Sequence, residues 1–221
     1  MATLLCIETA TTNCSVALSV NGSVIAFQED TSKEYSHAER LHVFIEEVLA
    51  KANLTKQDLD GIAVSKGPGS YTGLRIGVSA AKGLCYALDI PLISIPTLQS
   101  LMLQLKGVEG CVVSMLDARR MEVYAAVFSS EGKELRETRA EILTEHSFSE
   151  YLEKGKVHFI GSGTDKFEEI CTHKNAVFVK EKFPSAQTMA ILAEAKHKKS
   201  DIEDVAYFEP YYLKDFMGTK L

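Results

Sequence analysis

Two acidic residues, Glu8 and Asp117, stand where apolar segments end and short polar turns begin. Glu8 lies in "IETATTNCSVAL" and Asp117 lies in "LDARRMEVY". Nucleotide-binding α/β proteins hold phosphate and Mg²⁺ at turns of this kind, and the turn usually reads D-x-G because glycine lets backbone amides approach the phosphate. Neither turn contains glycine here. We therefore expect the isolated chain to bind ATP weakly or not at all.

A third segment, "FIGSGTDKF" (159–167), has the G-x-G pattern of a strand-to-helix adenosine loop, although a structural turn explains it equally well. Together the three segments define a possible vestigial nucleotide site, whose candidate residues are Glu8, Thr9, Asp117, Arg119, Gly161 and Gly163. No catalytic residue is predicted, because the chain has no G-x-S-x-G elbow and its histidines show no serine or cysteine partner.

The stretch "SKGPGSYTGLRIG" (65–77) invites a phosphate-loop interpretation, since a glycine-rich turn before a helix is the usual anion site. Its spacing does not fit. A Walker loop reads G-x-x-x-x-G-K-[ST], whereas Gly67 to Gly73 has one residue too many and no lysine follows. We interpret this stretch as a tight turn that packs closely, with Ser70 as the N-cap of the following helix.

That helix is expected to run from Tyr71 to Leu88, and it contains three glycines, each of which costs about 1 kcal/mol relative to alanine in a helix interior. Close approach of another backbone would offset this cost. The small side chains lie at i, i+4, i+7 and i+8 and predict a shallow groove, formed by Gly73, Gly77, Ala80 and Ala81. The helix that fills the groove belongs either to a partner or to the same chain.

The first helix is expected over Ser36 to Ala52, and its apolar residues follow an amphipathic pattern. His37 and His42 lie five residues apart, which places them about 140° apart on a helix, whereas the i, i+4 spacing of H-E-x-x-H keeps two ligands on one face. No metal site is predicted.

The elements that must position these residues occur twice. Each half begins with three short strands: "TLLCIE", "CSVALSV" and "SVIAFQE" in the first half, and "CVVSMLD", "EVYAAVF" and "KELRETR" in the second. Alternating helices and strands follow each triplet, with helices predicted over Ser36–Ala52, Tyr71–Leu88, Thr97–Lys106, Thr144–Leu152, Thr164–Thr172 and Ala186–Lys198. The pattern predicts an α/β protein with two duplicated lobes, residues 1–106 and 107–221, each a mixed sheet with helices.

Composition limits the class of protein. The 221 residues carry a formal net charge of −6. This charge argues against binding of a nucleic acid by this chain alone, because phosphate binding depends on clustered Lys and Arg. No apolar run approaches the roughly 18 residues of a membrane span. We expect a cytoplasmic protein with no membrane association, whose five cysteines are free thiols.

Several segments, in this order and at these distances, resemble the TsaB family of bacterial tRNA modification proteins. They are "LLCIETATTNCSVAL", "SHAERL", "SKGPGSYTGLRIGVSAAKGL", "PLISIPTLQSL" and "DARRMEVYAAVF". The resemblance is dense over residues 4–128, and beyond them only "GSG" (161–163) and "EPYYLKD" (209–215) continue it. It implies the actin-like, sugar-kinase-like ATPase fold of two duplicated lobes.

The resemblance also implies a function. The homologous catalytic subunit, TsaD-like, transfers a threonylcarbamoyl group to N6 of the adenosine next to the tRNA anticodon and holds a metal through H-x-x-x-H, a motif that this chain lacks. The chain is then a non-catalytic partner subunit without a cofactor of its own. ATP or ADP and the metal are expected on partner subunits, a TsaE-like ATPase is expected to join the pair, and tRNA is contacted only through the complex.

The partner interface that the resemblance implies lies on the two helices that begin at Ser36 and Tyr71. Its candidate residues are His37, Arg40, Leu41, Phe44, Tyr71, Thr72, Gly73, Leu74, Arg75, Gly77 and Val78. Because an exposed groove of small and apolar residues seldom stays solvated, the isolated chain is expected to form a homodimer through the same surface. The alternatives are a free-standing ATP-dependent kinase or phosphotransferase, which the glycine-free turns disfavour, and a metallopeptidase, which lacks ligands.

Overall fold

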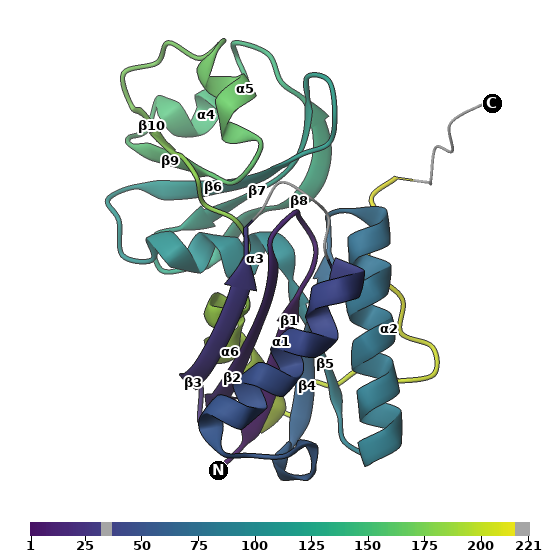
Figure 1. Ribbon diagram of the computed structural model, residues 1–221. Helices are drawn as coiled ribbons and strands as arrows, with labels where there is room; N and C mark the ends of the chain where they lie inside the picture. Colours follow the sequence, from purple (N-terminus) through teal and green to yellow (C-terminus); the bar gives the residue numbers. More distant parts are fainter. Residues whose placement is uncertain (32–36, 215–221) are drawn as a thin grey trace, which may run out of the picture.

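The computed structural model describes residues 1–31 and 37–214, which form two α/β lobes, one above the other in Figure 1. The N-terminal sheet has the order β3-β2-β1-β4-β5, with β1 (Thr3–Glu8), β2 (Cys14–Val20), β3 (Ser23–Asp30), β4 (Gly61–Gly67) and β5 (Leu92–Pro96). The C-terminal sheet has the order β10-β9-β6-β7-β8, with β6 (Cys111–Asp117), β7 (Glu122–Ser129), β8 (Glu134–Ile142), β9 (Val157–Ile160) and β10 (Ala176–Val179).

The two sheets share one topology. In the first, β1 pairs antiparallel with β2 and parallel with β4. In the second, β6 pairs antiparallel with β7 and parallel with β9. Counting outward from these central strands, both sheets have the same strand order. The internal duplication predicted from the sequence is confirmed.

The helices are α1 (His37–Ala52), α2 (Tyr71–Leu88), α3 (Thr97–Met102), α4 (Ser149–Leu152), α5 (Thr164–Glu168) and α6 (Ala186–Lys198), with 3-10 turns η1 (Lys56–Asp58) and η2 (Leu103–Leu105). Ser36, the expected first residue of α1, lies outside the described residues. At α2, Ser70 accepts a hydrogen bond from the Gly73 amide, which confirms the predicted N-cap. The helices predicted over Thr97–Lys106, Thr144–Leu152 and Thr164–Thr172 are shorter than the sequence pattern indicated.

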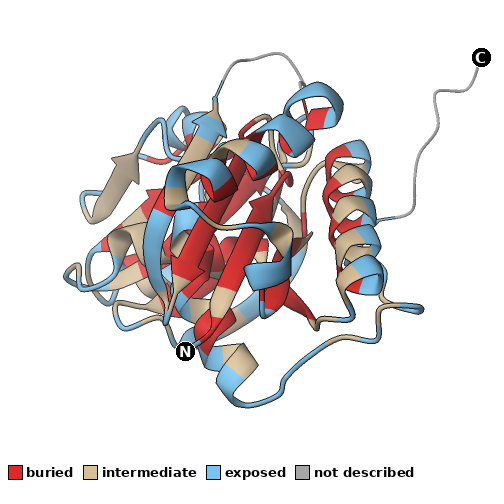
Figure 2. Ribbon diagram, turned by 60° about the horizontal axis from the view of Figure 1, so that its bottom comes forward, coloured by how far each residue is buried: buried red, intermediate tan, exposed pale blue. Residues whose placement is uncertain are grey.

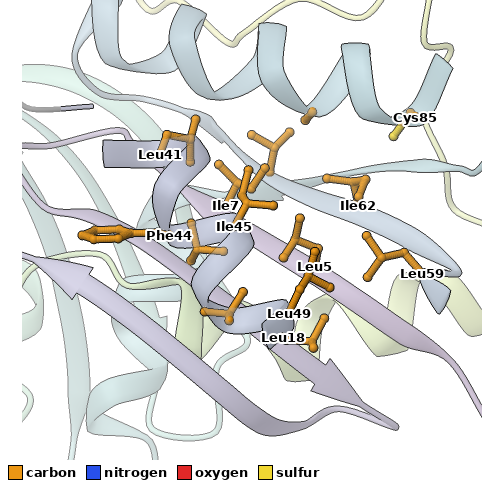
Figure 3. Packing of buried hydrophobic residues seen from close by; sticks show 14 of the residues in the cluster. Leu5, Ile7, Leu18, Leu41, Phe44, Ile45, Leu49, Leu59, Ile62 and Cys85 are labelled. Atoms are coloured by element: carbon orange, nitrogen blue, oxygen red, sulfur yellow. The ribbon is translucent and has the colours of Figure 1, made fainter. Parts of the chain in front are cut away.

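The core of the N-terminal lobe lies on both faces of its sheet. On one face, α1 and α2 cover Leu5, Ile7 and Ile62 (Figure 3). On the other face, α6 packs through Met189 and Ala193. Strands buried on both faces read as nearly continuous apolar runs, and Figure 2 shows the central strands as buried. No helix in residues 1–31 and 37–214 is long and apolar enough to cross a membrane.

The predicted boundary between residues 106 and 107 separates the strands of the two sheets, but the lobes exchange helices across it. The helix α3 belongs to the first segment in sequence, but Leu98, Leu101 and Met102 pack on the C-terminal sheet. Conversely, α6 belongs to the second segment but covers β1, β2 and β5 of the N-terminal sheet. Ser100 of α3 and Thr188 of α6 meet with their hydroxyl oxygens 2.8 Å apart. The lobes are therefore not two consecutive stretches of chain.

Candidate functional site

The turn after β1 holds a buried carboxyl group. The Glu8 side chain is fully buried, and its Oε1 accepts hydrogen bonds from the Ala10 amide at 2.6 Å and the Ser65 hydroxyl at 2.7 Å. Oε2 has no hydrogen-bond partner within the described part of the chain. Burial raises the pKa of Glu8 from 4.5 to about 7. A carboxyl group that is partly protonated at neutral pH and enclosed by protein is a poor ligand for a hydrated Mg²⁺ ion.

The same turn supports the start of α2. A Cβ at Gly73 would clash with the Thr9 carbonyl oxygen, and a Cβ at Gly77 would clash with the Thr9 hydroxyl. The Ser70 amide donates to the Ala10 carbonyl at 2.7 Å. The prediction that Gly73 and Gly77 contact a separate partner is therefore wrong, because the turn of this chain already fills the space that they leave.

In the C-terminal lobe, the acidic side chain of the turn after β6 is bound by other groups of the chain. Asp117 Oδ1 accepts from the Arg119 amide at 2.6 Å and lies 3.0 Å from Lys166 Nζ. Gly161, with φ of +109°, and Gly163 leave room for the Met115 carbonyl and the Val123 side chain, respectively. The G-x-G segment therefore makes a structural turn. Neither acidic turn presents the free carboxylate and open backbone amides that Mg²⁺ and phosphate need, so these residues do not fit a bound nucleotide.

A small cavity of about 240 Å³ lies where the lobes meet. Its walls include Lys66, Phe128, Glu134, Glu137 and Tyr211. Pockets for drug-sized ligands usually measure about 300 Å³ or more, and two carboxylates repel a triphosphate. This cavity does not suit ATP either.

A groove of about 820 Å³ lies along α1 and α2, which are side by side in Figure 1. We call it the α1–α2 groove, and its lining residues are Ala38, His42, Tyr71, Thr72, Arg75, Ile76, Ser79, Ala80, Gly83 and Leu84. Most of these side chains are small or apolar. Of the predicted interface residues, Tyr71, Thr72 and Arg75 lie in the groove.

Other predicted interface residues lie elsewhere. Arg40 is exposed but pairs with Asp30 at 3.1 Å and does not line the groove. Five more are buried in the lobe, so they cannot touch a partner directly: His37, Leu41, Phe44, Leu74 and Val78. His37 Nε2 lies 2.7 Å from the Thr11 carbonyl oxygen, and burial lowers the pKa of this histidine. The prediction that these five residues contact a partner is wrong, because α1 and α2 turn their apolar faces toward the sheet.

Sequence reasoning missed six of the groove residues: Ala38, His42, Ile76, Ser79, Gly83 and Leu84. The sequence offers only a weak signal, a third glycine in the middle of the helix, and the structure shows that a Cβ added at Gly83 would meet no atom within 4 Å. A glycine that is neither packed nor left-handed suggests an exposed helix face. Within the described residues, no group of three or more His, Cys, Asp or Glu side chains is arranged to hold a metal.

The polar side chains on the exposed face of α2 hold a returning segment of the chain. Lys82 Nζ donates to the carbonyls of Ala206 at 3.1 Å and Phe208 at 3.0 Å. Arg75 Nε donates to the Tyr212 hydroxyl at 3.2 Å, and the Tyr71 and Tyr212 rings are 4.9 Å apart. We call residues 204–214 the tail segment. It runs along α2 and borders the α1–α2 groove.

Comparisons with known proteins agree with this fold. The family model "TsaD: tRNA N6-adenosine threonylcarbamoyltransferase" matches residues 29–217. A tRNA threonylcarbamoyladenosine biosynthesis protein TsaB from Haemophilus influenzae is 30% identical over 99% of this chain and 96% of its own length. A tRNA N6-adenosine threonylcarbamoyltransferase from Bacillus thuringiensis is 38% identical over 42% of this chain and 31% of its own length. The crystal structure of a Pseudomonas aeruginosa protein with similarity to peptidase YEAZ has a TM-score of 0.85 and 24% identity, and the match covers 97% of this chain and 100% of that one.

Proposed function

Because the chain belongs to the TsaB family of tRNA threonylcarbamoyladenosine biosynthesis proteins, we propose that it is the non-catalytic partner of a TsaD-like threonylcarbamoyl transferase. Its two related sheets form the α/β, actin-like fold that the sequence resemblance implied. Its part in threonylcarbamoylation of the adenosine beside the tRNA anticodon is to bind and support the catalytic subunit. A free-standing kinase of the same fold is not favoured.

The α1–α2 groove is the observation that carries this proposal. It is open, lined mainly by small and apolar side chains, and formed by two adjacent helices. Exposed apolar surfaces of this kind usually mark protein interfaces. The occupant we assign is the TsaD-like subunit, since that family's model matches most of this chain. Two homologous chains can present equivalent faces to each other across an approximate two-fold axis, so a pair of helices from the transferase suits the groove.

The acidic turns support a non-catalytic role. Glu8 is buried and bound by Ser65, and Asp117 lies against Lys166. Neither side chain is available for a metal–nucleotide complex without rearrangement of the turn that it stabilises. In the assembly that we propose, ATP or ADP and the metal are held by the transferase and by a TsaE-like ATPase subunit, and the complex works in the cytoplasm.

Reconstitution of the complex tests the proposal. The chain and a TsaD-like subunit from the same cell are purified separately, mixed, and followed by sedimentation velocity and by transfer of labelled threonylcarbamoyl to tRNA. We expect a stable heteromeric species, and transfer that depends on both chains. Modification by this chain alone, or full activity of the transferase without it, would contradict the proposal.

A further inference from the structure

The hairpin turn between β6 and β7 has two consecutive arginines in a backbone conformation that favours glycine and asparagine. Arg119 has φ of +71° and Arg120 has φ of +50°. The hairpin between β2 and β3 meets the same demand with Asn21 and Gly22, the usual pair for such turns. Backbone preference alone would not select arginine at these positions, so the side chains themselves require an explanation.

Neighbouring groups hold the tip of this hairpin in place. Asp117 accepts from the Arg119 amide, as described above. The Lys166 side chain is only 14% exposed, and besides meeting Asp117 it donates to the carbonyls of Arg120 at 2.5 Å and Glu122 at 3.1 Å. One ammonium group thus contacts three oxygens of the turn. The two arginines therefore project from a fixed backbone, which lowers the entropic cost of binding a ligand.

The other charged side chains around the tip of the hairpin pair with one another, so Arg119 and Arg120 remain without a charged partner among them. Asp117 pairs with Lys166, and Glu122 pairs with Lys214 of the tail segment. Arg119 and Arg120 are exposed, and within residues 1–31 and 37–214 neither guanidinium has a hydrogen-bond or ion-pair partner. The tip is a local positive site on a chain whose net charge is −6. The guanidinium fork matches phosphate oxygens in a bidentate geometry.

The tail segment places this tip near the end of the α1–α2 groove. Its residue Lys214 meets Glu122 of the hairpin, and Tyr212, two residues earlier, packs on Tyr71 of the groove. Two residues of chain span at most about 7 Å. The tail segment therefore contacts both the hairpin and the rim of the groove, and we infer that a partner seated in the groove lies beside the two arginines.

We propose that Arg119 and Arg120 bind phosphates of the tRNA backbone in the assembled complex, an inference that rests on the proposed function. RNA is favoured over an acidic protein surface because two adjacent unpaired guanidinium groups suit a row of phosphates spaced along a strand. The chain then contributes directly to substrate binding, although its overall charge prevents it from binding tRNA alone.

The test compares complexes of the full chain with its transferase partner. The double variant Arg119→Asn/Arg120→Gly introduces residues that suit the backbone conformation of the turn and removes both positive charges. Its matched control is Arg139→Gln, which removes an exposed arginine that already pairs with Glu141 in the same lobe. Heterodimer assembly is first measured by sedimentation. The affinity for a tRNA transcript with adenosine beside the anticodon is then measured by fluorescence anisotropy at salt concentrations from about 50 to about 200 mM.

We expect the double variant to fold and assemble like the parent chain, to bind tRNA about tenfold more weakly, and to lose about 1.5 from the slope of log affinity against log salt. The control variant should leave both quantities unchanged. An unchanged affinity and slope would overturn the proposal. Loss of heterodimer affinity instead would assign the arginines to an acidic patch of the partner, and a selective loss of ATP binding by the complex would assign them to free nucleotide. Failure of the parent chain to assemble would refute the proposed function separately.

Discussion

Glu8 is the residue whose environment differs most from that of an ordinary surface carboxylate. It is fully buried and receives two hydrogen bonds on one oxygen, yet burial still raises its pKa to about 7. An acid at this strand end could be predicted from the sequence. Its enclosure could not, because Ser65 comes from a neighbouring strand 57 residues away and only the folded sheet brings the two together.

This environment predicts that stability depends on pH. In the unfolded chain Glu8 ionises near pH 4.5, whereas in the folded chain it retains its proton until about pH 7. The folded state therefore binds more protons between these values, and the free energy of unfolding should fall as pH rises, by about 3 kcal/mol across the window. Urea denaturation at pH 5 and pH 8 measures the change.

The variant Glu8→Gln provides the comparison, because it cannot ionise. His37, whose pKa is lowered by burial, contributes a pH dependence of the opposite sign in both proteins. The difference between parent and variant therefore isolates Glu8. If the two proteins lose stability in parallel as pH rises, the carboxyl group is not held protonated as described.

At the scale of elements, α2 has two faces with different tasks. The inner face is fixed by the turn after β1, which meets Gly73 and Gly77. The outer face lines the α1–α2 groove and carries the tail segment. The start, the end and the Ser70 cap of this helix could be predicted from local sequence. Its rotation about its own axis could not, because glycines signal a close contact without saying whether the neighbour belongs to the same chain.

Three alanine substitutions on α2 test this assignment of faces. At Gly73 and Gly77 the new methyl group would press against Thr9, and we expect each substitution to lower the free energy of unfolding by about 1 to 3 kcal/mol. At Gly83 the methyl group meets nothing, so Gly83→Ala should raise it by up to about 1 kcal/mol. Thermal and urea unfolding distinguish the two cases. Equal effects at all three positions would show that the faces are assigned wrongly.

At the scale of the whole molecule, duplication explains most of what could be predicted. The repeated strand pattern predicted two lobes with matching topology, and the strand orders of the two sheets confirm this prediction. The exchange of α3 and α6 between lobes was not predictable from the order of elements, since each helix packs on the sheet that is more distant in sequence. The exchange ties the lobes together and places the tail segment beside α2.

The exposed groove also predicts the behaviour of the isolated chain. Without its partner, the protein should form a homodimer through the α1–α2 groove, because a second copy can cover the same apolar surface. Sedimentation equilibrium over a range of protein concentrations measures this association. Addition of the transferase subunit should replace the homodimer with the heteromer. A chain that remains monomeric at high concentration contradicts the prediction.

Binding of the transferase in the α1–α2 groove can be measured directly with variants that fill the groove. Isothermal titration of the transferase subunit compares the parent chain with Gly83→Arg and Ala38→Arg, which place a long cation in the groove from either helix. The control is Ala50→Arg, an exposed position of α1 outside the groove. We expect both groove variants to bind at least about a hundredfold more weakly, since a buried unpaired charge would cost about 3 kcal/mol or more, while the control binds like the parent. Equal binding by all four proteins would show that the transferase does not bind in the α1–α2 groove and that the interface lies on another face.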